Sequence, residues 1–310
     1  LLAALLSPPN AVEVERFHLQ SNPWVNLHQR LLYAANFEAP PPQRLTDEER
    51  ATWLAAVETY RTYFAKRSPI FDQELVKMNA ALSATFDAEL PKTIPPLPAD
   101  VLRKLIPVYM RVQWKDDDFT NQFWISLAKP MLASAAKELI AAHEKAYGMP
   151  FPKRVRIDVS AFAGEYGAYT VGDAESVHST LSPNDPAYQG FAALEMLMHE
   201  TSHGIVDINS GAIGADLNKA AKELHRRYPP NLWHALLFYT SGELARAALA
   251  RRGIMDYQPI IYRGMFDRQF RGFQQSFETH WRAMLEGKIS REEAMKQIVT
   301  ELGKPEQPVH

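Results

Sequence analysis

Hydrophobic residues recur at helical spacing through the first half of the chain. Between residues 51 and 66 the apolar side chains fall every three or four positions, and Thr46 with Glu49 forms a capping box that predicts the start of this helix. The longest pattern of this kind predicts a helix from about residue 119 to residue 147. The region 1–150 is therefore expected to be helical, with proline-rich breaks between its helices.

The pattern changes to alternation after residue 150. Apolar and polar residues alternate over 155–159, which indicates a strand, and two further short strands are expected at 168–171 and 176–181. A helix is expected from about 187 to 206, and helical patterns continue through the rest of the chain. This order, with helices on either side of a small sheet, predicts a mostly helical α+β fold rather than a doubly wound sheet.

The expected organisation is a helical N-terminal region, 1–150, and a catalytic region, 151–310, unless the two form one continuous domain. A chain of 310 residues is long enough for either arrangement. The sequence contains no internal repeat and no low-complexity segment, so a repeat architecture is not expected.

Composition and charge exclude several kinds of chemistry. The chain has no cysteine, so disulfides, thiolate metal ligands and cysteine nucleophiles are excluded. Its net charge of -2 includes no basic excess, and nucleic acid is therefore not an expected partner. No apolar run is long enough for a membrane span. The apolar residues 1–7 match either the remainder of a signal peptide or the end of a first helix, and a secreted or periplasmic location is slightly favoured over the cytoplasm.

The residues best suited to catalysis are 199–203, His-Glu-Thr-Ser-His. On a helix, His199 and His203 lie one turn apart on the same face, where both imidazoles can bind one cation. Glu200 lies next to the first histidine and can take a proton from water at the metal. The surrounding residues are apolar, which predicts a buried helix, and burying these three polar groups without a partner would be costly. The alternative is a solvated helix face that carries this pattern by chance.

In residues 199–203 the sequence resembles the zincin metallopeptidases, and the resemblance extends over about residues 150–250. It implies a zinc cofactor, a peptide or protein substrate, and a small mixed sheet that precedes the active helix. In this family the edge strand of the sheet lines the substrate cleft, so 168–171 or 176–181 is the expected edge strand. The N-terminal half resembles no particular zincin subfamily.

A catalytic zinc needs a third protein ligand besides His199 and His203. Val206 stands where the metzincin branch of the zincins has glycine. The resemblance therefore favours the gluzincin branch, in which a glutamate from a later helix completes the site. The apolar helix expected at 232–252 is the place to look for this ligand.

His234 and Glu243 are the two candidates for the third ligand, and they point to opposite sides of a straight helix because they are nine residues apart. Glu243 is preferred, because small neighbours such as Gly242 would allow a close approach to the active helix. Its alternative role is an ion pair with Arg246. His234 would otherwise be the ligand itself, a donor to the oxyanion, or a core histidine. Position 247 is alanine where the gluzincin pattern has aspartate.

A hydrogen-bond donor for the oxyanion of the reaction is also expected near the metal. Tyr239 is the first candidate, because it shares the helix face that carries Glu243. Asp207 could orient a metal ligand or simply end its helix. Packing is the commoner role of the remaining candidates, which are Tyr166, Tyr169 and His178 for the oxyanion and His28 for closing the cleft.

These features predict a zinc-dependent hydrolase, a metallopeptidase that cleaves peptide bonds with water activated by Glu200. The expected catalytic residues are Glu200, Tyr239 and His234, and the expected ligands of Zn2+ are His199, His203 and Glu243. The alternative is a non-proteolytic zinc-binding protein with a zincin fold, acting as a sensor or an interaction module. The sequence leaves the particular substrate and the oligomeric state open.

Overall fold

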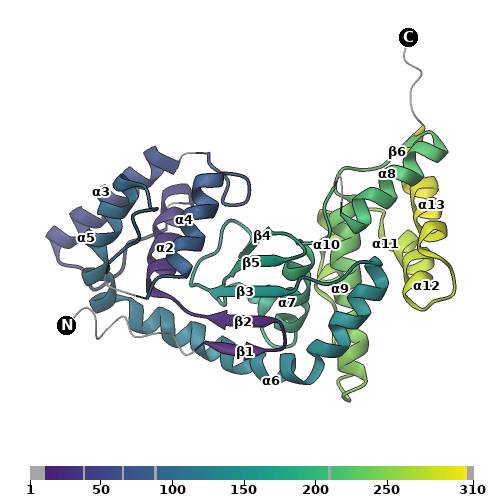
Figure 1. The fold of residues 1–310 in the computed structure, drawn as a ribbon, viewed down its shortest axis with the longest axis horizontal. Coiled ribbons are helices and arrows are strands. Elements are labelled where there is room, and N and C mark those ends of the chain that lie inside the picture. Colours follow the sequence, from purple (N-terminus) through teal and green to yellow (C-terminus); the bar gives the residue numbers. More distant parts are fainter. Residues whose placement is uncertain (1–10, 38, 65, 87–88, 209–210, 306–310) are drawn as a thin grey trace, which may run out of the picture. The chain divides into compact units, whose positions relative to one another are not determined.

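The computed structural model describes residues 11–37, 39–64, 66–86, 89–208 and 211–305. Helices dominate it, and a five-stranded sheet is its main β structure (Figure 1). The expectation of a mostly helical α+β fold is therefore confirmed. Residues 1–7, for which a signal-peptide remnant was one expectation, lie outside the described part of the chain.

The chain divides into two compact units. The first comprises Leu1–Pro130, Arg154–Val171 and Ser176–Gly190, and the second comprises Met131–Lys153, Gly172–Glu175 and Phe191–His310. This division differs from the predicted boundary at residue 150. The physical reason is that the strands after residue 150 pair with a strand from the first twenty residues, so the sheet belongs to the unit of the N-terminal helices.

The five strands of the sheet lie in the order β1-β2-β3-β5-β4 (Figure 1). Strands were predicted at the positions of β3, β4 and β5, the first of them from alternation, whereas β1 and β2 were not predicted. The β1–β2 pair is antiparallel, and β2–β3 and β3–β5 are parallel. The bounds are β1 Val12–Val14, β2 Phe17–Gln20, β3 Arg154–Val159, β4 Ala168–Gly172 and β5 Ser176–Leu181.

The register of the parallel strands gives the sheet one polar face. Gln20, Asp158 and Thr180 lie side by side in neighbouring strands. Asp158 is fully buried, accepts a hydrogen bond from Nε2 of Gln20 at 2.7 Å and pairs with His178. These side chains satisfy one another inside the unit, as buried polar groups must. Ile157, next to Asp158 along its strand, points to the opposite face and is buried and apolar.

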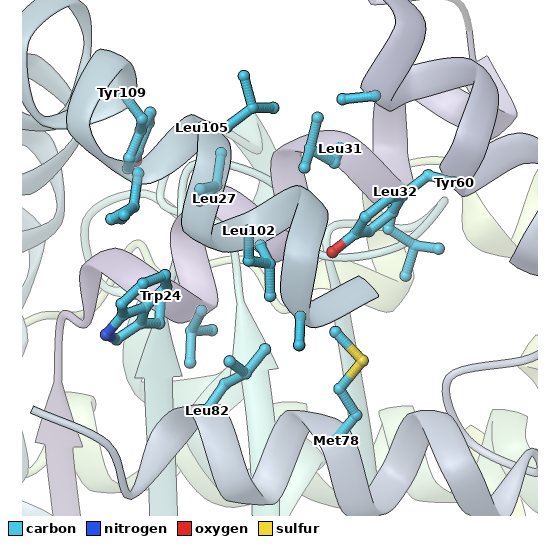
Figure 2. Close-up of a cluster of buried hydrophobic side chains, with 14 of the residues drawn as sticks. Trp24, Leu27, Leu31, Leu32, Tyr60, Met78, Leu82, Leu102, Leu105 and Tyr109 are labelled. Carbon is cyan, nitrogen blue, oxygen red and sulfur yellow. The ribbon is translucent and has the colours of Figure 1, made fainter. Parts of the chain in front are cut away.

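Helices α2 to α5 of the first unit share one hydrophobic core, in which side chains from α2, α3, α4 and α5 interdigitate (Figure 2). The predicted capping box begins α3, because the Thr46 N–H donates to the Glu49 carboxylate at 3.0 Å and the Glu49 N–H donates to Thr46 Oγ1 at 3.3 Å. The bounds are α2 Pro23–Phe37, α3 Asp47–Phe64, α4 Gln73–Ser83 and α5 Pro96–Val112.

The long helix α6 (Trp114–Tyr147) was predicted, with Pro130 inside it.

In the second unit, α7 and α9 pack against each other, and α8 packs against α13. No helix of the described residues is long and apolar enough to cross a membrane. The helices of this unit are α7 Ala192–Ser202, α8 Ala212–Leu224, α9 Leu232–Ala250, α10 Met265–Arg268, α11 Gln274–Ser276, α12 Arg282–Leu285 and α13 Arg291–Leu302.

Short elements complete the described chain. The first unit contains a 3-10 turn η1 (Pro186–Tyr188), and the second contains another, η2 (Ile260–Tyr262), and a π-helical turn η3 (Phe277–Trp281). A two-residue pairing joins β6 (Arg226–Arg227) to β7 (Lys304–Pro305). Ser290 caps α13 by accepting from the Glu293 N–H at 3.1 Å.

Candidate metal centre

The helix that carries the His-Glu-x-x-His residues is α7, and every residue of it is buried. The helix spans Ala192–Ser202, so it is shorter than the predicted helix over residues 187–206. His203 forms its C-cap and keeps α-helical backbone angles. The one-turn spacing therefore holds, and the ring centroids of His199 and His203 lie 5.0 Å apart.

The third imidazole comes from the first turns of α9. Nε2 of His234 lies 3.4 Å from Nε2 of His199, and the His234 ring centroid is 5.3 Å from the centroids of both His199 and His203. One ligand atom from each histidine falls within 4.8 Å of the other two. Within the described ranges this is the one group of three or more potential metal ligands.

The distances within this histidine cluster suit a small tetrahedral cation. Zinc binds histidine nitrogen at about 2.0–2.1 Å, which places two tetrahedral ligand atoms roughly 3.3 Å apart. The Nε2 atoms of His199 and His234 are 3.4 Å apart. Three imidazoles and no thiolate form a donor set that zinc accepts, and in catalytic zinc sites three protein ligands leave a position for water.

Burial keeps the three imidazoles neutral, which is the state that binds a metal. It lowers the pKa of His234 to about 4, and burial together with the neighbouring His234 lowers the pKa of His203 to about 3. Burial and the other two imidazoles of the cluster also hold the pKa of His199 well below its usual value. Near neutral pH each ring therefore has a free lone pair.

Aromatic rings pack around the histidine cluster. The ring of Phe238 lies 3.9 Å from that of His199 and 4.9 Å from that of His234, measured between centroids. Trp233 stacks on His234 at 5.0 Å. Neither ring was predicted to lie at the site. The sequence does show that Trp233 directly precedes His234 and that Phe238 follows it by four residues.

Glu243, the preferred third ligand from the sequence, is not part of the cluster. Its carboxylate is 8% exposed, forms an ion pair with Arg246, and lies 3.9 Å from Nη2 of Arg282. The structure therefore brings His234, and not Glu243, to the two motif histidines. The nine-residue separation explains the difference, because only one of the two positions on α9 can face α7.

Tyr239 lies with Glu243 rather than with the histidines. It follows His234 by five residues, about 140° around the helix. Its hydroxyl oxygen accepts a hydrogen bond from Nε of Arg282 at 3.1 Å, and burial raises the pKa of Tyr239. The observed partners give Tyr239 a place in the packing around Arg282, and they do not support its expected role as the oxyanion donor.

The other candidates have partners within their own units. Nε2 of Gln29 donates to the hydroxyl of Tyr169 at 2.6 Å. Tyr166 is 67% exposed. His28 is buried, with its Nδ1 atom 3.2 Å from the hydroxyl of Tyr60. Asp207 is half-buried just beyond α7.

A buried carboxylate on α7 was also missed from the sequence. Glu195 lies one turn before His199 and is fully buried. It accepts hydrogen bonds from the Tyr257 hydroxyl and from the Ile260 N–H, the latter at 3.1 Å, and burial raises its pKa to about 7. The signal in the sequence was a lone charge within an apolar helix.

Comparison of the chain with protein-family models, curated proteins and solved structures found no match.

Proposed function

We propose that this chain is a zinc-dependent hydrolase whose metal is held by His199, His203 and His234. The observation that carries the proposal is the convergence of three neutral imidazoles, whose ligand atoms lie within 4.8 Å of one another. His199 is buried and the other two are half-buried, and grouping such side chains with little access to water is costly unless they share a cation. Three histidines are also one of the ligand sets of catalytic zinc.

Glu200 is the proposed general base. A zinc ion with three protein ligands lowers the pKa of its water towards neutrality and polarises a carbonyl group. Glu200 follows His199 on α7 and is only 5% exposed, so solvent screens its carboxylate little. That carboxylate is suited to accept the proton of the attacking water and to deliver it to the leaving nitrogen. Peptide bonds are the proposed substrate on the strength of the zincin resemblance of residues 199–203.

The proposal gives Glu243 and Tyr239 no part in the chemistry. Both are grouped around Arg282, and the ion pair of Glu243 with Arg246 was its alternative role in the sequence. A carboxylate that two arginines already neutralise would have to give up these partners before it could bind a cation. His234 faces the motif histidines without any such cost.

Metal content distinguishes the two candidate ligands. We expect one zinc per chain in the purified protein, and a loss of zinc affinity in His234→Ala larger than the 10- to 100-fold that removal of an outer-shell partner costs. Glu243→Gln is the matched control and should keep its zinc. Elemental analysis and titration against a chromophoric chelator measure both. Zinc loss in Glu243→Gln together with retention in His234→Ala would reverse the assignment.

Hydrolysis is tested separately from metal binding. In Glu200→Gln the amide cannot accept a proton, so peptide cleavage should fall by about 10²–10⁴-fold while the zinc content stays at that of the wild type. Cleavage of a peptide library is followed by mass spectrometry. Glu286→Gln, at a half-exposed position on the surface, is the control with unchanged activity.

Two outcomes of that assay would count against the proposal in different ways. Full activity in zinc-loaded Glu200→Gln would remove Glu200 from the mechanism. A wild-type protein that holds zinc but cleaves no member of the library would favour the alternative of a zinc-binding module without peptidase activity.

A further inference from the structure

One nitrogen of the histidine cluster lacks the partner that metal ligands usually have. A metal-binding histidine almost always donates its second ring N–H to a carboxylate, a carbonyl or water, which fixes the orientation of the ring. His199 directs Nε2 towards His234, and its Nδ1 atom is buried without a hydrogen bond to any described residue. Something other than a hydrogen bond from the protein must therefore orient this imidazole.

Phe238 makes the closest ring contact of the cluster. Its centroid lies 3.9 Å from that of His199, with 32° between the planes, so the two rings are close together and tilted. A flat ring at this distance restricts rotation of the imidazole about its bond to the chain, because any large turn would drive ring atoms into the phenyl face.

The same phenyl ring also contacts the ligand from α9. Phe238 follows His234 by four residues, so the two side chains lie on the same face of the helix, with their centroids 4.9 Å apart. Phe270, which is 3% exposed, packs beside both rings, with its centroid 6.2 Å from that of Phe238 and 6.4 Å from that of His234. Phe238 thus contacts two of the three proposed ligands and packs against a buried aromatic neighbour.

We propose that Phe238 is a positioning residue of the metal centre, whose ring orients His199 by close ring contact in place of a hydrogen bond to Nδ1. The inference rests on the proposed zinc site and adds a determinant of its affinity. It predicts that zinc affinity and coordination geometry depend on an aromatic ring at position 238, and not only on an apolar side chain there. A residue that only filled space could be replaced by another apolar side chain without effect on the coordination geometry.

The test compares zinc affinity and coordination geometry in variants of the full chain. Phe238→Leu should bind zinc about 3- to 10-fold more weakly, the range expected for loss of an aromatic pair. Its cobalt form should show shifted or broadened visible absorption bands, because these report ligand geometry. Phe238→Tyr keeps the ring and should match the wild type in both. If Phe238→Leu does not fold, Phe238→Met serves as the ring-free variant.

Phe266→Leu is the control for packing alone. Phe266 is buried among Tyr262 and Phe277. This variant should lose stability without changing the zinc affinity or the cobalt spectrum. The proposal is overturned by wild-type affinity and spectrum in the ring-free variant, by weak binding in Phe238→Tyr, or by an equal effect of Phe266→Leu. A wild-type protein that binds no zinc would instead refute the proposed function itself.

Discussion

Burial alone does not distinguish a candidate metal-binding histidine from a structural one in this chain. His28 on α2 and His199 on α7 are each 1% exposed. His28 has the Tyr60 hydroxyl beside it, whereas His199 faces two further imidazoles. The spacing of residues 199–203 carries this difference in the sequence, so the histidine pair can be located from the order of residues alone.

The third histidine and the phenyl ring of Phe238 beside the cluster could not be chosen from the sequence. Both Glu243 and His234 lie on α9, and the choice between them depends on the rotation of α9 about its own axis relative to α7. Residue spacing gives the angle between two positions on one helix, but not which of them faces a neighbouring helix. Periodicity also cannot decide whether Glu243 binds a metal or forms an ion pair with Arg246.

The buried His28 makes the stability of the fold depend on pH. Burial lowers its pKa from 6.5 to about 3, so between these values the unfolded chain binds a proton that the folded protein does not. The free energy of unfolding therefore falls as the pH is lowered through this window, by up to about 1.4 kcal/mol per pH unit from this group. In His28→Asn, urea unfolding followed by circular dichroism should show a shallower fall.

The control for this pH series is His225→Asn. His225 is exposed and has a left-handed backbone (φ 52), which asparagine tolerates better than most residues. Its pH dependence should parallel that of the wild type. A slope in His28→Asn equal to the wild-type slope would contradict a neutral, buried His28.

Among the elements, α7, α9 and the segment before η2 meet around one glycine. A Cβ atom on Gly242 would lie 2.6 Å from Cβ of Pro259 and 3.2 Å from Oε1 of Glu195. Glu195 in turn accepts hydrogen bonds from Tyr257 and from the Ile260 N–H. The missing side chain at position 242 therefore sets how closely α9 approaches the carboxylate of α7.

Gly242→Ala is expected to destabilise the protein, although alanine is the better helix former. The gain in helix propensity is about 1 kcal/mol, while forcing a methyl group into a filled site costs about 1–3 kcal/mol. The overlap with Pro259 decides the sign, because a proline ring cannot rotate away. We expect a net loss of up to about 2 kcal/mol in the free energy of unfolding, measured with urea.

A double-mutant cycle attributes that loss to the contact. Pro259→Gly removes the opposing Cβ atom, so it should cost less stability in the Gly242→Ala background than in the wild type. Strictly additive effects, or a Gly242→Ala variant more stable than the wild type, would show that the close approach is not what requires glycine at this position.

Elements with a sustained pattern were predictable, and short ones were not. Alternation over residues 155–159 identified β3, and the apolar run identified α9. Strands β1 and β2 have only three and four residues. Strand β1 pairs with β2, and β2 pairs with β3, which is more than a hundred residues away in the chain. A local pattern does not indicate such a distant partner.

For the whole molecule, the candidate site and the fold differ in the sequence separation of the residues that they bring together. All three histidines lie within Phe191–His310 of the second unit, between residues 199 and 234. A motif search can therefore find most of the site. In the sheet of the first unit, residues 17–20 pair with the strand at residues 154–159. The change of pattern near residue 150 therefore marks a further strand of that sheet. It does not mark a boundary between the compact units.

This long-range pairing has a consequence for biosynthesis. The β1–β2 hairpin leaves the ribosome about 130 residues before the strand that covers its edge. At a synthesis rate of about 5–20 residues per second, the hairpin waits for roughly 7 to 27 seconds. During that time its backbone N–H and C=O groups are open to pairing with any other extended chain. Nascent copies of this protein are therefore most in need of a chaperone before the second half of the message has been translated.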